Sequence, residues 1–70
     1  MNYKSIAIAE IESFANEFEN YTLGQILRAV LNRKPEGISD RDWLYTVSDV
    51  DLYTAIEKTK LIEAENWIIK

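Results

Sequence analysis

The sequence contains no cysteine and no histidine among its 70 residues. A zinc finger needs thiolate or imidazole ligands, and a Ser-His-Asp triad needs an imidazole base. Neither these sites nor a thiol nucleophile can be built from this chain. We therefore name no catalytic, metal-ligating or cofactor-binding residue. We expect a protein that is not an enzyme, needs no cofactor and has no small-molecule substrate.

Glycine, proline and long apolar runs are also scarce. Two glycines and one proline leave few residues for the many tight turns of an all-β fold. The longest uninterrupted apolar run covers residues 6–9, whereas a membrane-spanning helix needs roughly 20 apolar residues. Two glutamates also end this run before it reaches the length of a secretion signal. We expect no membrane association and a cytoplasmic location.

Negative charge exceeds positive charge, with 12 acidic residues against 8 basic ones and a formal net charge of −4. Nucleic-acid-binding surfaces depend on clustered lysine and arginine that neutralise phosphates. A helix-turn-helix built from residues 23–46 would present Asp40 and Asp42 at the start of its recognition helix and would repel DNA. We therefore disfavour a DNA-binding function and expect a protein partner or self-association.

Apolar residues recur at helical spacing through most of the chain. The spacing predicts helices at about residues 5–20, 23–33, 40–46 and 49–60. The predicted inner faces include Ile8 and Phe14 in the first helix, Leu27 in the second, and Trp43 and Leu44 in the third. The sequence thus predicts an all-α fold, a small bundle of three to four short helices with a single core, in one domain over residues 1–70. We expect the first two helices to form an antiparallel pair.

Three of the predicted helix starts share a capping pattern. In each, a hydroxyl residue can accept a hydrogen bond from the backbone N–H three residues later, and the side chain at that later position can return the bond. The pattern places Thr22 before Gln25, Ser39 before Asp42, and Ser48 before Asp51. Aspartate has a shorter reach, so the return bond is best supported at Thr22. Asn2 and Ser5 are both candidate caps of the first helix.

Four aspartates fall within twelve residues, at positions 40, 42, 49 and 51. This density raises the question of a calcium or magnesium site. An EF-hand loop needs oxygen ligands at its positions 1, 3, 5 and 12 and glycine at position 6, and neither possible starting residue satisfies that spacing. Aspartate is also preferred in the first turn of a helix, so we assign these residues to helix starts and expect no metal.

The helical stripe of residues 49–57 is not continued by the residues that follow. A straight continuation would place Glu63 on the same face as Ile56. We therefore expect a break or a change of buried face near residues 58–60. For residues 61–70 we expect continued helix, with a short strand as the alternative because Trp67, Ile68 and Ile69 have high β-propensity.

The apolar C-terminal segment either completes the core or contacts another chain. On the second alternative, the protein is a small acidic, non-enzymatic interaction module that self-associates or joins a larger assembly through this segment. We expect Tyr45 to point outward, where it could form a binding patch with Trp67, and we therefore include it among the candidate partner contacts. The candidate partner contacts are Leu61, Ile62, Trp67, Ile68, Ile69 and Tyr45.

An alternative function uses the acidic residues. In that case the protein is an inhibitor or regulator that docks onto a basic surface, such as that of a nucleic-acid-binding protein. A purely structural interpretation of these acidic residues competes with this function, because the outer faces of helices need charged side chains that water can solvate. The candidate acidic docking face comprises Glu10, Glu12, Glu17, Glu19, Asp40, Asp42, Asp49 and Asp51.

Overall fold

The structure, a computed structural model, describes the backbone of residues 2–69 and the side chains of residues 2–65. Within these residues it contains helices and no strand, which confirms the expected all-α fold. The helices are α1 (Tyr3–Glu17), α2 (Leu23–Leu31), α3 (Asp40–Thr46) and α4 (Asp49–Ile69). None of them, among the described residues, is both long enough and apolar enough to cross a membrane.

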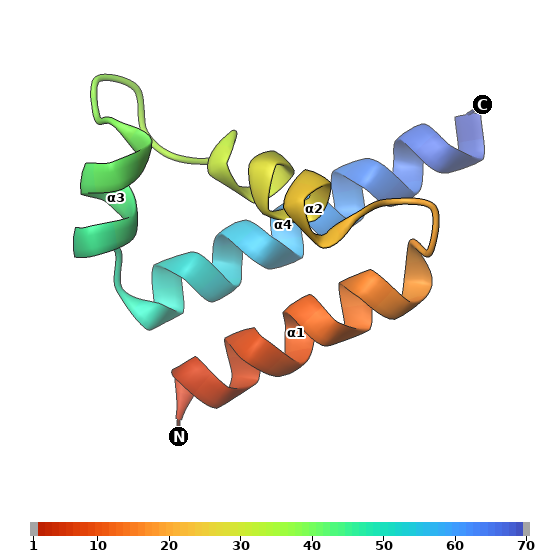
Figure 1. Ribbon diagram of the computed structural model, residues 1–70, viewed down its shortest axis with the longest axis horizontal. Helices are drawn as coiled ribbons and strands as arrows, with labels where there is room; N and C mark the ends of the chain where they lie inside the picture. Colours follow the sequence, from red (N-terminus) through yellow and green to blue (C-terminus); the bar gives the residue numbers. More distant parts are fainter. Residues whose placement is uncertain (1, 70) are drawn as a thin grey trace.

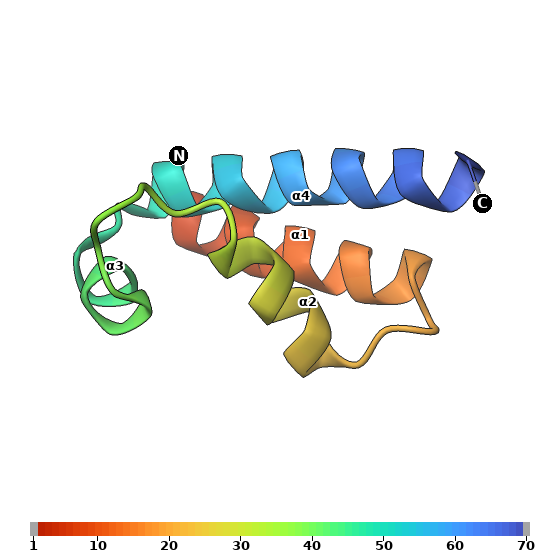
Figure 2. The same ribbon diagram turned by 90° about the horizontal axis from the view of Figure 1, so that it is seen from above.

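The most extensive helix–helix contact joins the first and the last helix of the chain. α1 and α4 lie side by side and run in the same direction (Figure 1). The view from above shows α2 crossing over α1, and α3 at the end where α1 and α4 begin (Figure 2). α2 contacts both α1 and α4. The sequence led us to expect a pair of α1 and α2; these two helices do contact each other, but α1 makes its most extensive contact with α4, which is longer than predicted.

Each helix begins at a polar side chain that accepts a backbone hydrogen bond. Asn2, and not Ser5, caps α1: its Oδ1 accepts from the N–H groups of Lys4 and Ser5 at 3.1 and 3.3 Å. At α2 the Thr22 hydroxyl accepts from the Gln25 N–H at 3.1 Å, and the Gln25 side chain accepts from the Thr22 N–H at 2.8 Å. These contacts complete the predicted capping box of α2.

The hydroxyls of Ser39 and Ser48 cap α3 and α4 in the same way. Each accepts from the backbone N–H three residues later, at 3.1 Å in both helices. The aspartates of the two first turns lie where the partial positive charge of a helix N-terminus favours them. The predicted helix starts at residues 23, 40 and 49 are therefore the observed ones.

The ends of α1 and α2 differ from the sequence-based boundaries, whereas α3 ends at Thr46 as predicted. α1 ends at Glu17, three residues early, where Phe18 closes the last turn by donating its N–H to the Phe14 carbonyl at 3.0 Å. α2 ends at Leu31, and residues 32–34 make tighter backbone bonds that span three residues. Pro35 disfavours helical backbone in the residue before it, Lys34, so the helix cannot continue beyond this tighter turn.

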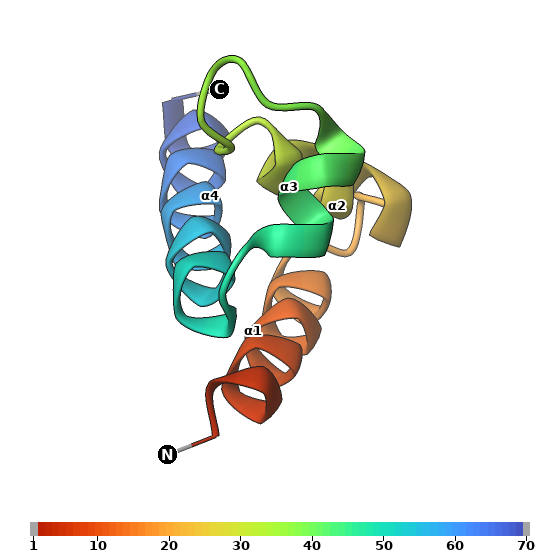
Figure 3. The ribbon, with the colours of Figure 1, turned by 90° about the vertical axis from the view of Figure 1, so that its left-hand side faces the viewer.

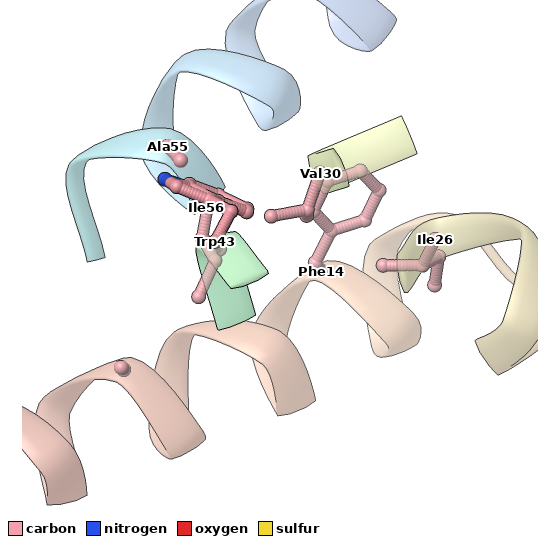
Figure 4. Packing of buried hydrophobic residues seen from close by; sticks show 7 residues of the cluster. Phe14, Ile26, Val30, Trp43, Ala55 and Ile56 are labelled. Carbon is pink, nitrogen blue, oxygen red and sulfur yellow. The ribbon is translucent and has the colours of Figure 1, made fainter. Parts of the chain in front are cut away.

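One cluster of buried residues occupies the space between the helices. It contains Phe14 of α1, Ile26 and Val30 of α2, Trp43 of α3 and Ile56 of α4, together with Ala7 and Ala55. Their side chains converge from all four helices (Figure 4). Because α3 is only seven residues long, Trp43 is its main anchor in this core.

α4 continues without a break through residues 58–60 and ends at Ile69, so the continued helix expected after residue 60 is confirmed and no interruption occurs. Its inner face becomes polar instead. Lys60 donates to Glu10 Oε1 at 3.0 Å and to Ser13 Oγ at 2.9 Å, and Tyr21 donates its hydroxyl to Glu63 Oε2 at 2.9 Å. The charged residues that interrupt the apolar stripe thus have partners on α1 and on the turn that follows it.

Candidate functional site

Two neighbouring hollows in the surface share the side chains of Ile11, Leu52 and Ile56. Their volumes are about 200 and 220 Å³. Because three lining residues are common to both, the two hollows adjoin each other, and we call the pair the apolar groove. Its other lining residues are Lys4, Ala7 and Ile8 of α1, Leu27, Val30 and Leu31 of α2, Leu44 of α3, and Asp49 of α4.

All four helices contribute to the groove, and their arrangement leaves it open. Seen from the side, α4 lies on one side of the molecule and α2 and α3 on the other, with α1 running below them (Figure 3). Leu52 and Ile56 of α4 lie one turn apart on the same helix face, and Ile8 and Ile11 of α1 are related in the same way. The short α2 and α3 cover only part of the apolar surface that α1 and α4 present.

Three large aliphatic side chains of the groove remain exposed to solvent. The exposed fraction is 64% for Ile8, 46% for Leu27 and 53% for Leu44. Sequence periodicity predicted all three on inner faces, and for these residues the prediction was wrong. Each lies on the apolar stripe of its helix, but no described part of the chain covers it.

Two residues of opposite charge, Lys4 of α1 and Asp49 of α4, line the same hollow of the groove. Among the described residues, neither belongs to an ion pair. Every other residue lining the apolar groove is apolar. The groove therefore offers apolar contact along most of its length, with one cation and one anion in one of its two hollows.

The predicted partner contacts outside the groove are placed on α3 and α4. Tyr45 is 91% exposed and Leu61 is 67% exposed, whereas Ile62 is half-buried. None of the three lines the apolar groove. Trp67, Ile68 and Ile69 belong to the last turns of α4, but their side chains lie outside the described residues.

Three of the eight residues of the predicted acidic docking face are engaged within the chain. Glu10 and Glu17 lie 3.0 and 3.6 Å from the Lys60 ammonium. Asp40 lies 3.4 Å from both Arg28 and Lys34, so the basic cluster at the end of α2 is partly neutralised as well. The other five are exposed: Glu12, Glu19, Asp42, Asp49 and Asp51.

The carboxyl groups of Glu10 and Glu57 influence each other's ionisation beside Lys60. The hydrogen bond from Lys60 lowers the pKa of Glu10, and the same contact raises the pKa of Lys60. The hydrogen bond with Glu10, followed by burial, raises the pKa of Glu57. The hydrogen bond to Glu63 likewise raises the pKa of Tyr21. The contacts of Lys60 hold α4 against α1, and the Tyr21–Glu63 bond holds α4 against the turn after α1. None of these residues lines the apolar groove.

The described residues contain no group of three or more side chains placed to hold a metal ion. Comparison of the chain with family models, with curated proteins and with solved structures finds no match. The apolar groove, built from the packing of this chain alone, is therefore the candidate functional site.

Sequence reasoning placed the groove residues in the core because periodicity identifies an apolar face without showing what covers it. One available signal was helix length. The nine residues of α2 include four large aliphatic residues besides Val30, and α3 carries Trp43 and Leu44 next to each other within seven residues. Helices so short cannot bury adjacent large side chains on one face, because consecutive residues point about 100° apart.

Proposed function

We propose that this chain is a small acidic, non-enzymatic protein-interaction module that binds an apolar segment of a protein partner in its groove. The observation that supports this function is the pair of adjoining hollows around Ile11, Leu52 and Ile56, with Ile8, Leu27 and Leu44 exposed on them. Clusters of exposed aliphatic residues are typical of interaction surfaces, because their contact with water is unfavourable and a partner can bury them.

The lining chemistry favours protein side chains over a small-molecule substrate. Small-molecule sites combine an apolar enclosure with several convergent polar groups that fix the orientation of the ligand. The hollow next to α2 and α3 is lined by aliphatic residues alone. An aliphatic side chain of a partner needs no polar contact there and gains free energy from leaving water.

The C-terminal segment remains a second proposed contact surface. Leu61 is exposed on α4 and does not line the groove. Docking through the acidic residues has less support, because Glu10, Glu17 and Asp40 are already paired with lysine or arginine of the same chain. We therefore favour the groove over both surfaces.

Two matched substitutions separate the groove from the C-terminal segment. Leu44→Glu places a charge in the groove, and Leu61→Glu places the same charge on an apolar residue of comparable exposure outside it. Both variants should retain the helical circular-dichroism spectrum, because both residues are more than half exposed. The tagged protein is cross-linked to its neighbours in its source cells, and the cross-linked proteins are identified by mass spectrometry.

We expect Leu44→Glu to lose its cross-linked proteins, including any cross-link to another copy of the chain, and Leu61→Glu to keep them. Loss in Leu61→Glu alone would assign the interaction to the C-terminal segment. A set of cross-linked proteins that neither substitution changes would contradict an interaction through apolar residues of either surface.

A further inference from the structure

The accessible surface of the chain is larger than its mass predicts. It measures 5288 Å² for a chain of 8.2 kDa, whereas the relation between mass and surface for compact monomers gives about 4,500 Å². The difference is roughly 700 to 800 Å² over the whole chain, including the end of α4 beyond residue 65, and a stable protein–protein interface buries about 800 Å² on each partner. The shape agrees with this surplus, since the molecule is flattened to 34 × 30 × 18 Å.

The charges of the groove are self-complementary. A two-fold symmetric dimer uses the same surface on both copies, so each attractive contact between two different residues occurs twice. Lys4 and Asp49 line the same hollow without pairing to any described residue of their own chain. A second copy related by a two-fold axis can therefore present its aspartate to the lysine of the first copy, and its lysine to the aspartate.

We propose that the apolar groove is occupied by a second copy of this chain, in a two-fold dimer that pairs Lys4 of each copy with Asp49 of the other. This proposal rests on the proposed function and names its partner. Ile8, Leu27 and Leu44 of each copy pack into the groove of the other and leave water. The two Lys4–Asp49 pairs favour this register of the two copies, because a register that leaves these charges unpaired or brings like charges together loses their attraction.

The first test measures the mass of the protein in solution against concentration. Sedimentation of the full chain should give twice the 8.2 kDa monomer mass at high concentration and a shift to monomer on dilution. Leu44→Glu should raise the dissociation constant of the dimer at least tenfold, whereas Leu61→Glu should leave this constant unchanged. Leu27→Glu provides an independent groove variant on α2. Circular dichroism confirms that each variant is folded.

The second test uses charge reversal in separate chains. Lys4→Glu and Asp49→Lys should each weaken self-association, because in each homodimer both inter-chain pairs become repulsive. An equimolar mixture of the two variants should form a heterodimer, because both of its inter-chain pairs are attractive. One pair joins the introduced glutamate to the introduced lysine, and the other joins the native Lys4 to the native Asp49. Recovery on mixing two separate chains cannot come from a contact within one chain.

The remaining outcomes would overturn the proposal in distinguishable ways. A dimer that survives Leu44→Glu but not Leu61→Glu would place self-association on the C-terminal segment. A monomer at all concentrations would exclude the second copy. In that case the probe 8-anilinonaphthalene-1-sulfonate decides about the groove: binding by the wild type and not by Leu44→Glu would leave the proposed function standing with another partner, and no binding by either would remove both.

Discussion

Lys60 connects α4 to α1 through three side chains of the first helix. Its ammonium group contacts Glu10, Ser13 and Glu17 while only 19% of its own side chain is exposed. Partly buried ion pairs of this kind are screened less by solvent than surface pairs. Glu57 is the unfavourable neighbour in this arrangement, because its carboxyl group lies against that of Glu10.

Replacing Glu57 by glutamine should stabilise the protein at neutral pH. A raised carboxyl pKa means that the folded state disfavours the ionised form, so Glu57 lowers the stability above its folded pKa and this penalty disappears as the pH falls. We expect Glu57→Gln to raise the urea midpoint at pH 7 and to lose this advantage near pH 4. The isosteric change Glu65→Gln at an exposed position of α4 is the control and should alter neither midpoint.

The protein should lose stability at alkaline pH. The pKa values of Lys60 and Tyr21 are raised above 10.5 and 10.0, so their contributions are complete below about pH 10 and are lost as the pH rises through the folded values. The pKa of Tyr53 is also raised, mainly because of the charge of Glu57. Urea unfolding between pH 8 and 12 measures the decline. Tyr21→Phe should make the decline shallower, and an identical slope in that variant would contradict a role for the Tyr21–Glu63 bond.

Helix starts were the best predicted elements. Each depends on a few neighbouring residues, such as Thr22 with Gln25, and local hydrogen bonds decide it whatever the rest of the fold does. The continuity of α4 was not predictable in the same way. Glu63 falls on the inner face of the helix and is satisfied by Tyr21, which is 42 residues away in the sequence. No local pattern indicates such a partner.

The three hydroxyl caps should differ in their contributions to stability. Loss of a serine or threonine cap typically costs about 1 kcal/mol. Thr22→Ala also weakens the hydrogen bond that the N–H of residue 22 donates to the Gln25 side chain. We therefore expect it to lower the free energy of unfolding more than Ser39→Ala or Ser48→Ala. Urea unfolding of the three variants provides the comparison. Equal losses at all three positions would show that the return bond at α2 contributes nothing measurable.

The core and the groove share the same residues, and this is why the functional site was harder to predict than the fold. Ile56 is only 1% exposed, yet it lines both hollows of the apolar groove. Whether Leu27 of α2 and Leu44 of α3 are covered depends on how far these two helices lie from each other and from α4. That distance is set by packing around Phe14 and Trp43 and not by the spacing of apolar residues along the chain.

A small domain depends on each member of such a core. One core of this size provides about 3 to 5 kcal/mol of net stability, and replacing a buried isoleucine by alanine costs about 2 to 5 kcal/mol. We expect Ile56→Ala to be largely unfolded at 25 °C by circular dichroism. Leu61→Ala, on the same helix but 67% exposed, should change the stability by less than about 0.5 kcal/mol. A folded Ile56→Ala variant would show that contacts beyond this core stabilise the chain.

The pairing of α1 with α4 also determines when the chain can fold during its synthesis. Of the two helices that make the most extensive contact, α1 leaves the ribosome before α2 and α3, and α4 leaves it after them. Phe14 emerges early, but Ile56 and the polar partners on α4 follow about forty residues later, and a core closed by such distant segments forms only after the intervening loop has lost its freedom. Nascent chains that end before α4 should therefore expose the apolar faces of α1 and α2, and chaperones that recognise such surfaces should bind them until the last helix is made.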